Sequence, residues 1–178
     1  MPTLPKPPDP GSRILRPWYS FTRAHVAAYR WSKGRIGGKL GRAPILLLHH
    51  VGRKTGAKRV SPLLYLPDGD DMVVVASMGG SDKHPSWWIN LRAKPETIVE
   101  VGGEKRAVVA EQASPDEKAR LWPRLVEMYP SYGTYQSRTN REIPVVILRR
   151  DISTRSEPSD AASSGSARTP HQSRPAGG

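Results

Sequence analysis

The sequence predicts a domain of the mainly β, α+β class, a six-stranded antiparallel barrel with flanking helices. Three observations favour this fold. Six short apolar segments are joined mostly by turn-forming residues, as is typical of hairpin-connected strands. Helical patterns occur in the longer links between these segments. Repeated β–α–β units are absent, which argues against a Rossmann domain.

Composition narrows the class of protein. Apolar residues make up 37% of the 178-residue chain, a low share that reflects its polar ends. No apolar run approaches the roughly 18 residues of a membrane-spanning helix, and the start of the chain lacks the pattern of a secretory signal. The absence of cysteine excludes disulfides, thiolate nucleophiles and iron–sulfur clusters. We therefore expect a cytoplasmic protein.

Charge and low-complexity segments divide the chain into four expected parts. The Pro-rich start predicts a disordered lead and the Ser/Ala/Gly/Pro-rich end a disordered tail. The arm after the lead is basic, and an acidic partner follows from its charge: nucleic acid, an anionic membrane surface or a polyanionic small molecule. The parts are a lead over residues 1–12, an arm over 13–42, a barrel over 43–150 and a tail over 151–178.

The arm carries a predicted amphipathic helix. Its apolar stripe is surrounded by arginine and lysine, with a proline where a helix starts and a glycine pair where one stops. Two interpretations stay open: the helix packs on its own domain, or it is a peripheral anchor at the inner face of the plasma membrane. In the second case, the aromatic residues expected to enter the membrane interface are Trp18, Phe21, Tyr29 and Trp31.

The barrel strands follow from short apolar runs. Pro62 places the second strand at a sheet edge or a bulge, because proline lacks a ladder donor. Gly102-Gly103 predicts a two-residue hairpin turn, and residues 67–70 predict another turn. The predicted strands span residues 45–51, 60–66, 72–77, 97–101, 104–110 and 143–148.

Two helices are predicted within the barrel sequence. The first spans residues 84–93, with Pro85 at its first position. The second opens with a capping box from Ser114 to Glu117, in which Pro115 takes the N1 position. Its expected core face consists of Leu121, Trp122, Leu125, Val126 and Tyr129.

A basic hairpin tip is the first candidate site. Residues 52–59 contain four cations and two glycines, and glycine lets backbone N–H groups approach phosphate oxygens. The spacing is not that of a P-loop. On spacing alone, an ordinary solvated hairpin tip is the favoured interpretation.

A Gly-rich segment over residues 76–85 is the second candidate. It leads from a strand to a helix N-terminus, where backbone donors and the helix dipole favour an anion. Trp87 and Trp88 follow, and they form either an aromatic wall of the site or part of the core.

Three tyrosines form the third candidate. Their spacing of three predicts that Tyr129, Tyr132 and Tyr135 share one face of a short helix, where phenols can pack on a flat ring and donate a proton. The adjacent His49 and His50 point to opposite faces of a strand and are a poor metal pair. No hydrolase signature accompanies them.

In order along the chain, the motifs Gly52-Arg53-Lys54-Thr55-Gly56, Ala76-Ser77-x-Gly79-Gly80 and Tyr129-Pro130-x-Tyr132-x-x-Tyr135 resemble the deazaflavin-dependent nitroreductase family. The resemblance covers about residues 40–150. It implies a split β-barrel that binds coenzyme F-420. It also implies hydride transfer from the reduced coenzyme to an electron-poor small-molecule acceptor such as a quinone or nitroaromatic.

The resemblance implies two cofactor-binding segments. The hairpin tip would hold the phosphate and the acidic oligoglutamate tail, and the Gly-rich segment would line the deazaflavin ring and its ribityl chain. The matching residues at the hairpin are Arg53, Lys54, Thr55, Gly56, Lys58, Arg59, Ser61 and Pro62. Those in and after the Gly-rich segment are Ala76, Ser77, Met78, Gly79, Gly80, Lys83, His84, Pro85 and Trp87.

A substrate pocket is implied as well, lined by Tyr65, Trp88, Tyr129, Tyr132 and Tyr135. Within it, Tyr135, Ser77 and Tyr132 match the catalytic positions that orient the acceptor or assist its protonation. No metal is expected.

Two alternatives stay open. The first is an FMN-binding flavin reductase on the same barrel, since a fold does not fix the cofactor. The second is a non-enzymatic basic module that binds lipid or nucleic acid through residues 13–42. Nucleic acid is not expected as a partner, because no recognised binding motif is present and the aromatic residues cluster on predicted helices.

Overall fold

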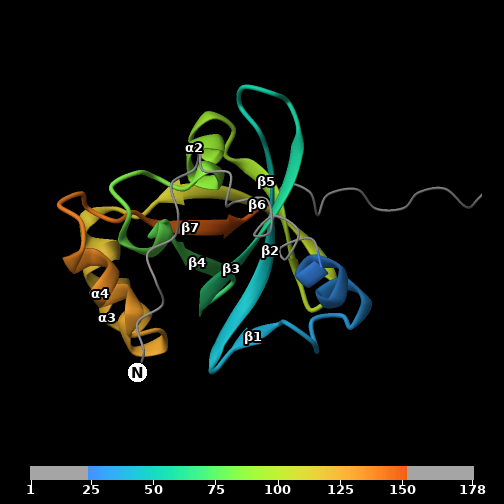
Figure 1. Cartoon of the computed structure of the whole chain (residues 1–178), viewed down its shortest axis with the longest axis horizontal. Helices are drawn as coiled ribbons and strands as arrows, with labels where there is room; N and C mark the ends of the chain where they lie inside the picture. Colours follow the sequence, from blue (N-terminus) through green and yellow to red (C-terminus); the bar gives the residue numbers. More distant parts are fainter. Residues whose placement is uncertain (1–23, 152–178) are drawn as a thin grey trace, which may run out of the picture.

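A computed structural model describes residues 24–151 of the chain. Within this range seven strands form one antiparallel sheet in the order β1-β2-β3-β4-β7-β6-β5, and an added pairing of β2 with β5 closes the last six into a barrel (Figure 1). The predicted six-stranded antiparallel barrel is thus confirmed, and β1 is an addition to it. The strands are β1 (Lys39–Leu40), β2 (Ala43–Val51), β3 (Lys58–Asp68), β4 (Asp71–Val75), β5 (Glu96–Val101), β6 (Glu104–Gln112) and β7 (Val145–Arg150).

Helices cover the barrel on opposite sides. Helix α3 (Pro115–Met128) and helix α4 (Ser131–Ser137) lie together on one side, and a helix described over residues 24–31 lies on the other (Figure 1). Helix α2 (Ser86–Ala93) follows a short 3-10 turn, η1 (Met78–Gly80). No helix within residues 24–151 is long and apolar enough to cross a membrane.

Two apolar cores follow from the alternation of side chains along the strands. In β4, Met72 and Val74 point into the barrel, whereas Val73 and Val75 point outward under α3 and α4. Burying each such side chain contributes about 1.5–3 kcal/mol. The barrel interior also holds Leu46, Leu48, Trp87, Trp88, Leu91, Val99, Val146 and Leu148.

Helix α3 begins as its sequence predicts. The Ser114 hydroxyl accepts from the backbone N–H of Glu117, and the Glu117 carboxylate accepts from the backbone N–H of Ser114. Leu121 and Leu125 are buried against the outer face of the barrel, and the rest of the predicted core face is half-buried there. Asp68 of β3 holds the far side of the helix through ion pairs with Arg120 and Arg124.

Some element boundaries differ from the prediction. Strand β4 ends at Val75 rather than residue 77, because the backbone enters the Gly-rich turn there. Helix α2 begins at Ser86, so Pro85 is its N-cap and not its first residue. Pro62 pairs with Leu47 in a part of β3 that has only β2 as a neighbour, because β4 joins from Tyr65 onward. Its missing N–H therefore costs the ladder nothing on the open side, as expected of an edge.

The helix over residues 24–31 packs on the barrel through Tyr29, which is only 1% exposed. The Tyr29 hydroxyl donates to the carbonyl of Ile45 (3.1 Å) and accepts from the N–H of Gly102 (3.0 Å). Next to it, Arg30 donates to both carboxylate oxygens of Glu100 at 2.6 and 3.0 Å. The expectation that Tyr29 enters a membrane is therefore wrong. Trp18 and Phe21 lie outside the described residues, as do the predicted lead and nearly all of the tail.

Candidate functional site

The loop between β2 and β3, residues 52–57, is closed by its own backbone. The N–H of Gly52 donates to the carbonyl of Ala57 (2.9 Å), and those of Thr55 and Gly56 donate back to the carbonyl of Gly52. A Cβ on Gly52 would lie 2.8 Å from the Thr55 hydroxyl, and Gly56 has a φ of +65°. Glycine is therefore favoured at both positions of this tight turn.

Four exposed cations surround this loop, which stands beside α2 (Figure 1). None of the ion pairs found within residues 24–151 includes them. Arg149, by contrast, pairs with three carboxylates. The loop therefore keeps its positive charge for an anionic ligand. The four cations are Arg53, Lys54, Lys58 and Arg59.

The Gly-rich turn follows β4 in an unusual conformation. Met78, Gly79 and Gly80 have successive φ values of +48°, +65° and +82°. A left-handed conformation is strained for methionine, and such strain gathers at functional sites. The turn ends at Pro85, the N-cap of α2.

Arg141 holds this turn in place. Its guanidinium donates to the carbonyls of Ala76 (3.1 Å), Ser77 (3.0 Å) and Ser81 (2.8 Å). It also lies 3.3 Å from Nδ1 of His84. Burial lowers the pKa of His84, and the positive charges of Arg141 and Arg92 lower it further. A neutral His84 suits this contact, because its bare nitrogen accepts from the guanidinium.

The three tyrosines form one cluster, but on two helices. Tyr129 is the C-cap of α3, whereas Tyr132 and Tyr135 belong to α4, and the prediction of a single helical face is wrong because Pro130 separates the helices. Their ring centroids lie 5.1–6.4 Å apart. The hydroxyls of Tyr129 and Tyr135 are 3.4 Å apart.

The environments of these phenols differ. Tyr132 is buried in the outer core, which raises its pKa. Tyr135 is half-buried, and burial together with the Tyr129 hydroxyl raises its pKa to about 12. Tyr135 is therefore protonated at neutral pH and can donate a hydrogen bond. Gly80 packs on the backbone of Tyr135, so the Gly-rich turn and the tyrosine cluster are neighbours.

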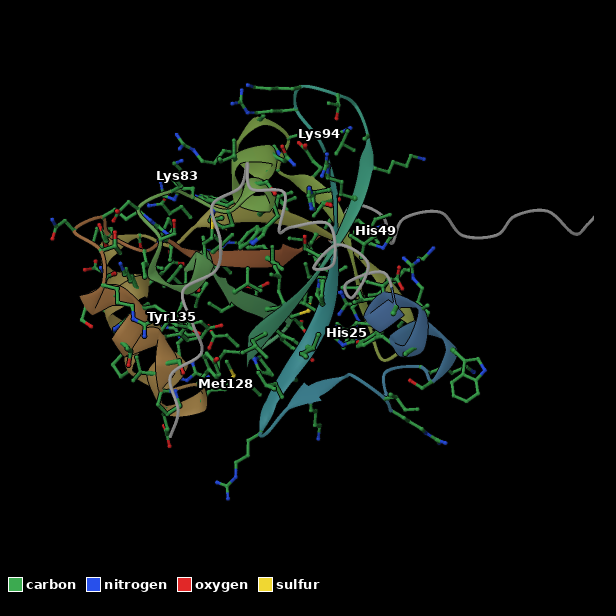
Figure 2. All side chains as sticks on the ribbon, viewed as in Figure 1. His25, His49, Lys83, Lys94, Met128 and Tyr135 are labelled. Atoms are coloured by element: carbon green, nitrogen blue, oxygen red, sulfur yellow. The ribbon has the colours of Figure 1, made fainter. Side chains whose placement is uncertain are left out.

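Other sequence-predicted site residues lie apart from this cluster. Trp87 and Trp88 pack inside the barrel, with ring centroids 6.2 Å apart. Tyr65 packs against the same interior core and lines a cavity of about 120 Å³ together with Arg106 and Arg150. Figure 2 shows Tyr135 on the side of the barrel that carries α3 and α4, and His49 on the opposite side.

Sequence analysis missed the residues that hold the site's backbone. Asn90 of α2 accepts from the N–H of Arg53 at 3.1 Å, and His50 contacts Asn90. An asparagine beside Leu91 in the helix predicted over residues 84–93 was the one available signal. No group of three or more metal-ligating residues is found within residues 24–151.

A barrel with a basic loop, and with a Gly-rich turn packed against a phenol cluster, is an arrangement that suits an oxidoreductase with an anionic redox cofactor. A family model described as F420H2-dependent quinone reductase matches residues 21–150. The chain belongs to this family, whose hydride donor is reduced coenzyme F-420 (F420H2).

Relatives agree with the family model. An F420H2-dependent quinone reductase of Mycobacterium tuberculosis is 44% identical over 132 residues, which are 72% of this chain and 89% of that protein. A solved F420H2-dependent reductase, FDR-A, is 38% identical with a TM-score of 0.55, over 60% of this chain and 94% of that one. A solved structure described as a domain-swapped dimer is 32% identical with a TM-score of 0.58, over 75% of this chain and 99% of that one.

Proposed function

We propose that this chain binds F420H2 across the basic loop and the Gly-rich turn and uses it to reduce a quinone-type acceptor beside Tyr135. The observation that carries the proposal is the set of four exposed cations on the loop, which take part in none of the ion pairs found within residues 24–151. The loop is held by α2, the helix that follows the Gly-rich turn. When bound, the coenzyme supplies the hydride. The protein supplies position, charge and a proton donor.

The loop fits the acidic part of the coenzyme. Arg53, Lys54 and Arg59 are proposed to bind its phosphate and oligoglutamate tail, with Lys58 beside them. A charge-assisted hydrogen bond of this kind contributes about 1.5–3 kcal/mol. Because the cations are exposed, added salt should screen them and weaken binding.

The Gly-rich turn fits the flat part of the coenzyme. Gly79 carries no side chain, so we expect a ring to approach the backbone between Ser77 and Lys83. Arg141 saturates carbonyls on the inner side of this turn, so the turn is already ordered before a ligand binds.

Tyr135 is the proposed proton donor to the acceptor. Its raised pKa keeps the phenol protonated, and the Tyr129 hydroxyl at 3.4 Å fixes its direction. Tyr132 supports both rings from the core through an edge-to-face contact with each.

The proposal is tested by titrating the full chain with coenzyme F-420 and, separately, with FMN. We expect tighter binding of F-420, stronger for longer oligoglutamate tails and weaker with added salt, because four cations exceed what the single phosphate of FMN needs. Tighter binding of FMN would favour a flavin reductase on the same barrel instead.

An anionic membrane surface is the proposed second partner. Trp31 is 82% exposed, and Ile36 and Leu40 are each more than half exposed. Four exposed cations alternate with them at Lys33, Arg35, Lys39 and Arg42. We name these seven residues the N-terminal basic patch. Anionic headgroups attract such cations by about 1 kcal/mol each, while the apolar side chains suit the interface. This would bring the enzyme to a bilayer-dissolved quinone.

A further inference from the structure

A chain of buried polar groups links the basic loop to α2 and β3. His50, at the end of β2, is 5% exposed, and Asn90 of α2 is 8% exposed. The His50 ring contacts the Ser61 hydroxyl through Nε2 (3.1 Å) and the Asn90 amide through Nδ1 (2.8 Å). The Asn90 side chain in turn meets the backbone N–H of Arg53 at 3.1 Å.

The directions of these hydrogen bonds are determined by one group. The backbone N–H of Arg53 can only donate, so the carbonyl oxygen of Asn90 must face it. The Asn90 NH2 group then faces His50 and donates to Nδ1, which must carry no proton. The proton of His50 is therefore on Nε2 and points to the hydroxyl of Ser61.

The surroundings keep His50 neutral. Burial, followed by the positive charge of Arg59 on β3 and by His49 on β2, lowers its pKa to about 4. Helix α2 contributes only the uncharged Asn90 to these contacts. At neutral pH the bare Nδ1 is thus always present to accept from Asn90.

We propose that His50 and Asn90 are positioning residues for the basic loop. They fix the backbone of Arg53, and this places the Arg53 side chain, the first cation of the loop, where it can bind the coenzyme. The inference rests on the proposed binding of coenzyme F-420 to this loop. A loop that is already ordered loses less conformational entropy on binding, so the contacts of His50 and Asn90 should tighten coenzyme binding. Removing these contacts should raise the Kd and KM for the coenzyme and leave kcat nearly unchanged.

The test compares three α2 variants in the full chain. Asn90→Leu removes both hydrogen bonds. Asn90→Asp keeps the acceptor for the Arg53 N–H and loses only the donor to His50, so it is the conservative variant. Leu91→Val is the matched control, because Leu91 is also buried, lies one residue away and packs in the barrel interior. Two quantities are measured: amide hydrogen exchange at Arg53 without coenzyme, and the Kd for coenzyme F-420.

We expect Asn90→Leu to speed exchange at Arg53 and to weaken coenzyme binding about tenfold, the value of one or two hydrogen bonds. Asn90→Asp should stay within about threefold of the wild type, and Leu91→Val should alter neither quantity. Unchanged exchange at Arg53, an unchanged Kd in Asn90→Leu, or an equal loss in Leu91→Val would each overturn the inference. A wild-type protein that does not bind coenzyme F-420 would instead refute the proposed function, while the exchange data would still decide whether Asn90 holds the loop.

Discussion

Gly80 lies so close to Tyr135 that no side chain fits between them. A Cβ on Gly80 would stand 2.7 Å from the carbonyl oxygen of Tyr135 and 3.0 Å from the Cβ of Arg138. Gly80 also has a φ of +82°, which side chains rarely adopt. Glycine at this position therefore allows the Gly-rich turn to pack directly on the backbone of α4 at Tyr135.

Gly80→Ala is expected to separate the Gly-rich turn from α4. The left-handed conformation alone costs about 1 kcal/mol of unfolding free energy, and the collision adds about 1–3 kcal/mol of overpacking. Gly69→Ala is the matched control, because Gly69 has a φ of +64° and open space around its Cβ position. Denaturant unfolding should show a larger loss of unfolding free energy for Gly80→Ala than for Gly69→Ala. Turnover by Gly80→Ala should also be slower. Equal losses in the two variants would show that the contact with Tyr135 has no energetic role.

Removing one cation from the basic loop should weaken coenzyme binding and leave the fold intact. Arg53→Ala, Lys54→Ala and Arg59→Ala are each expected to lose about 1–3 kcal/mol of coenzyme binding free energy. Lys105→Ala, an exposed cation on β6, is the control for a change in net charge. Isothermal titration measures the affinity. If all three loop variants bind like Lys105→Ala, the loop is not part of the site.

Tyr135→Phe should slow reduction of the acceptor while coenzyme affinity stays near the wild-type value. Its phenol is expected to donate to the acceptor, and its pKa of about 12 predicts no loss of activity from Tyr135 ionisation below about pH 10. Tyr132→Phe, in the core of the same cluster, is the comparison that should act on stability. Steady-state kinetics with several quinones provide the measurement. Identical kcat values for the wild type and Tyr135→Phe would contradict the role.

Membrane binding should depend on the exposed apolar residues of the N-terminal basic patch. The triple variant Trp31→Gln, Ile36→Gln and Leu40→Gln removes them and leaves Tyr29 and Arg30 docked on the barrel. Ile98→Gln, an exposed apolar residue on β5, is the control. With anionic phosphatidylglycerol vesicles at low salt, the wild type and Ile98→Gln should co-sediment and the triple variant should not. A wild type that stays in the supernatant would refute the anchor.

Stability should fall as the pH drops from about 6.5 to 4. The folded protein holds His50 neutral with a pKa of about 4, whereas the unfolded chain takes up the proton below about 6.5, so the unfolded state binds more protons in this window. His84, whose pKa burial also lowers, adds to the slope. Glu100, with a lowered pKa, contributes only below its ordinary value of about 4.5. Urea unfolding between pH 5 and 7 should show a shallower slope for His50→Gln than for the wild type; equal slopes would contradict the prediction.

Local patterns explain how much of the fold was predictable. Short apolar runs identified β2, β4 and β7, the capping box identified the start of α3, and the glycine pair at 102–103 identified the β5–β6 hairpin. Each signal lies within about ten residues of sequence. Strand β1, with two exposed residues, has no apolar pattern and was therefore missed.

The site was predictable in its parts and not in its connections. Basic and Gly-rich segments were visible as motifs, but the donors that fix them come from far along the chain: Arg141 lies 64 residues from Ser77, and Asn90 lies 37 residues from Arg53. A single sequence carries no record of such pairings. The predicted single helical face of the three tyrosines was wrong for a local reason. Pro130 lies between the end of α3 and the start of α4, yet the three rings still form one cluster.

Glu100 ties the N-terminal helix to the barrel. Its side chain is 4% exposed and is shared by Arg30 and His49, so one buried carboxylate joins the N-terminal helix, β2 and β5. A polypeptide shortened to begin at residue 43 would leave that carboxylate with His49 alone and remove Tyr29 from the barrel surface. A buried carboxylate that loses a partner is destabilising, although the exposure of Arg30 makes the cost smaller than for a fully buried pair. Trimming the N-terminal helix is therefore expected to lower the stability of the barrel before it changes any partner.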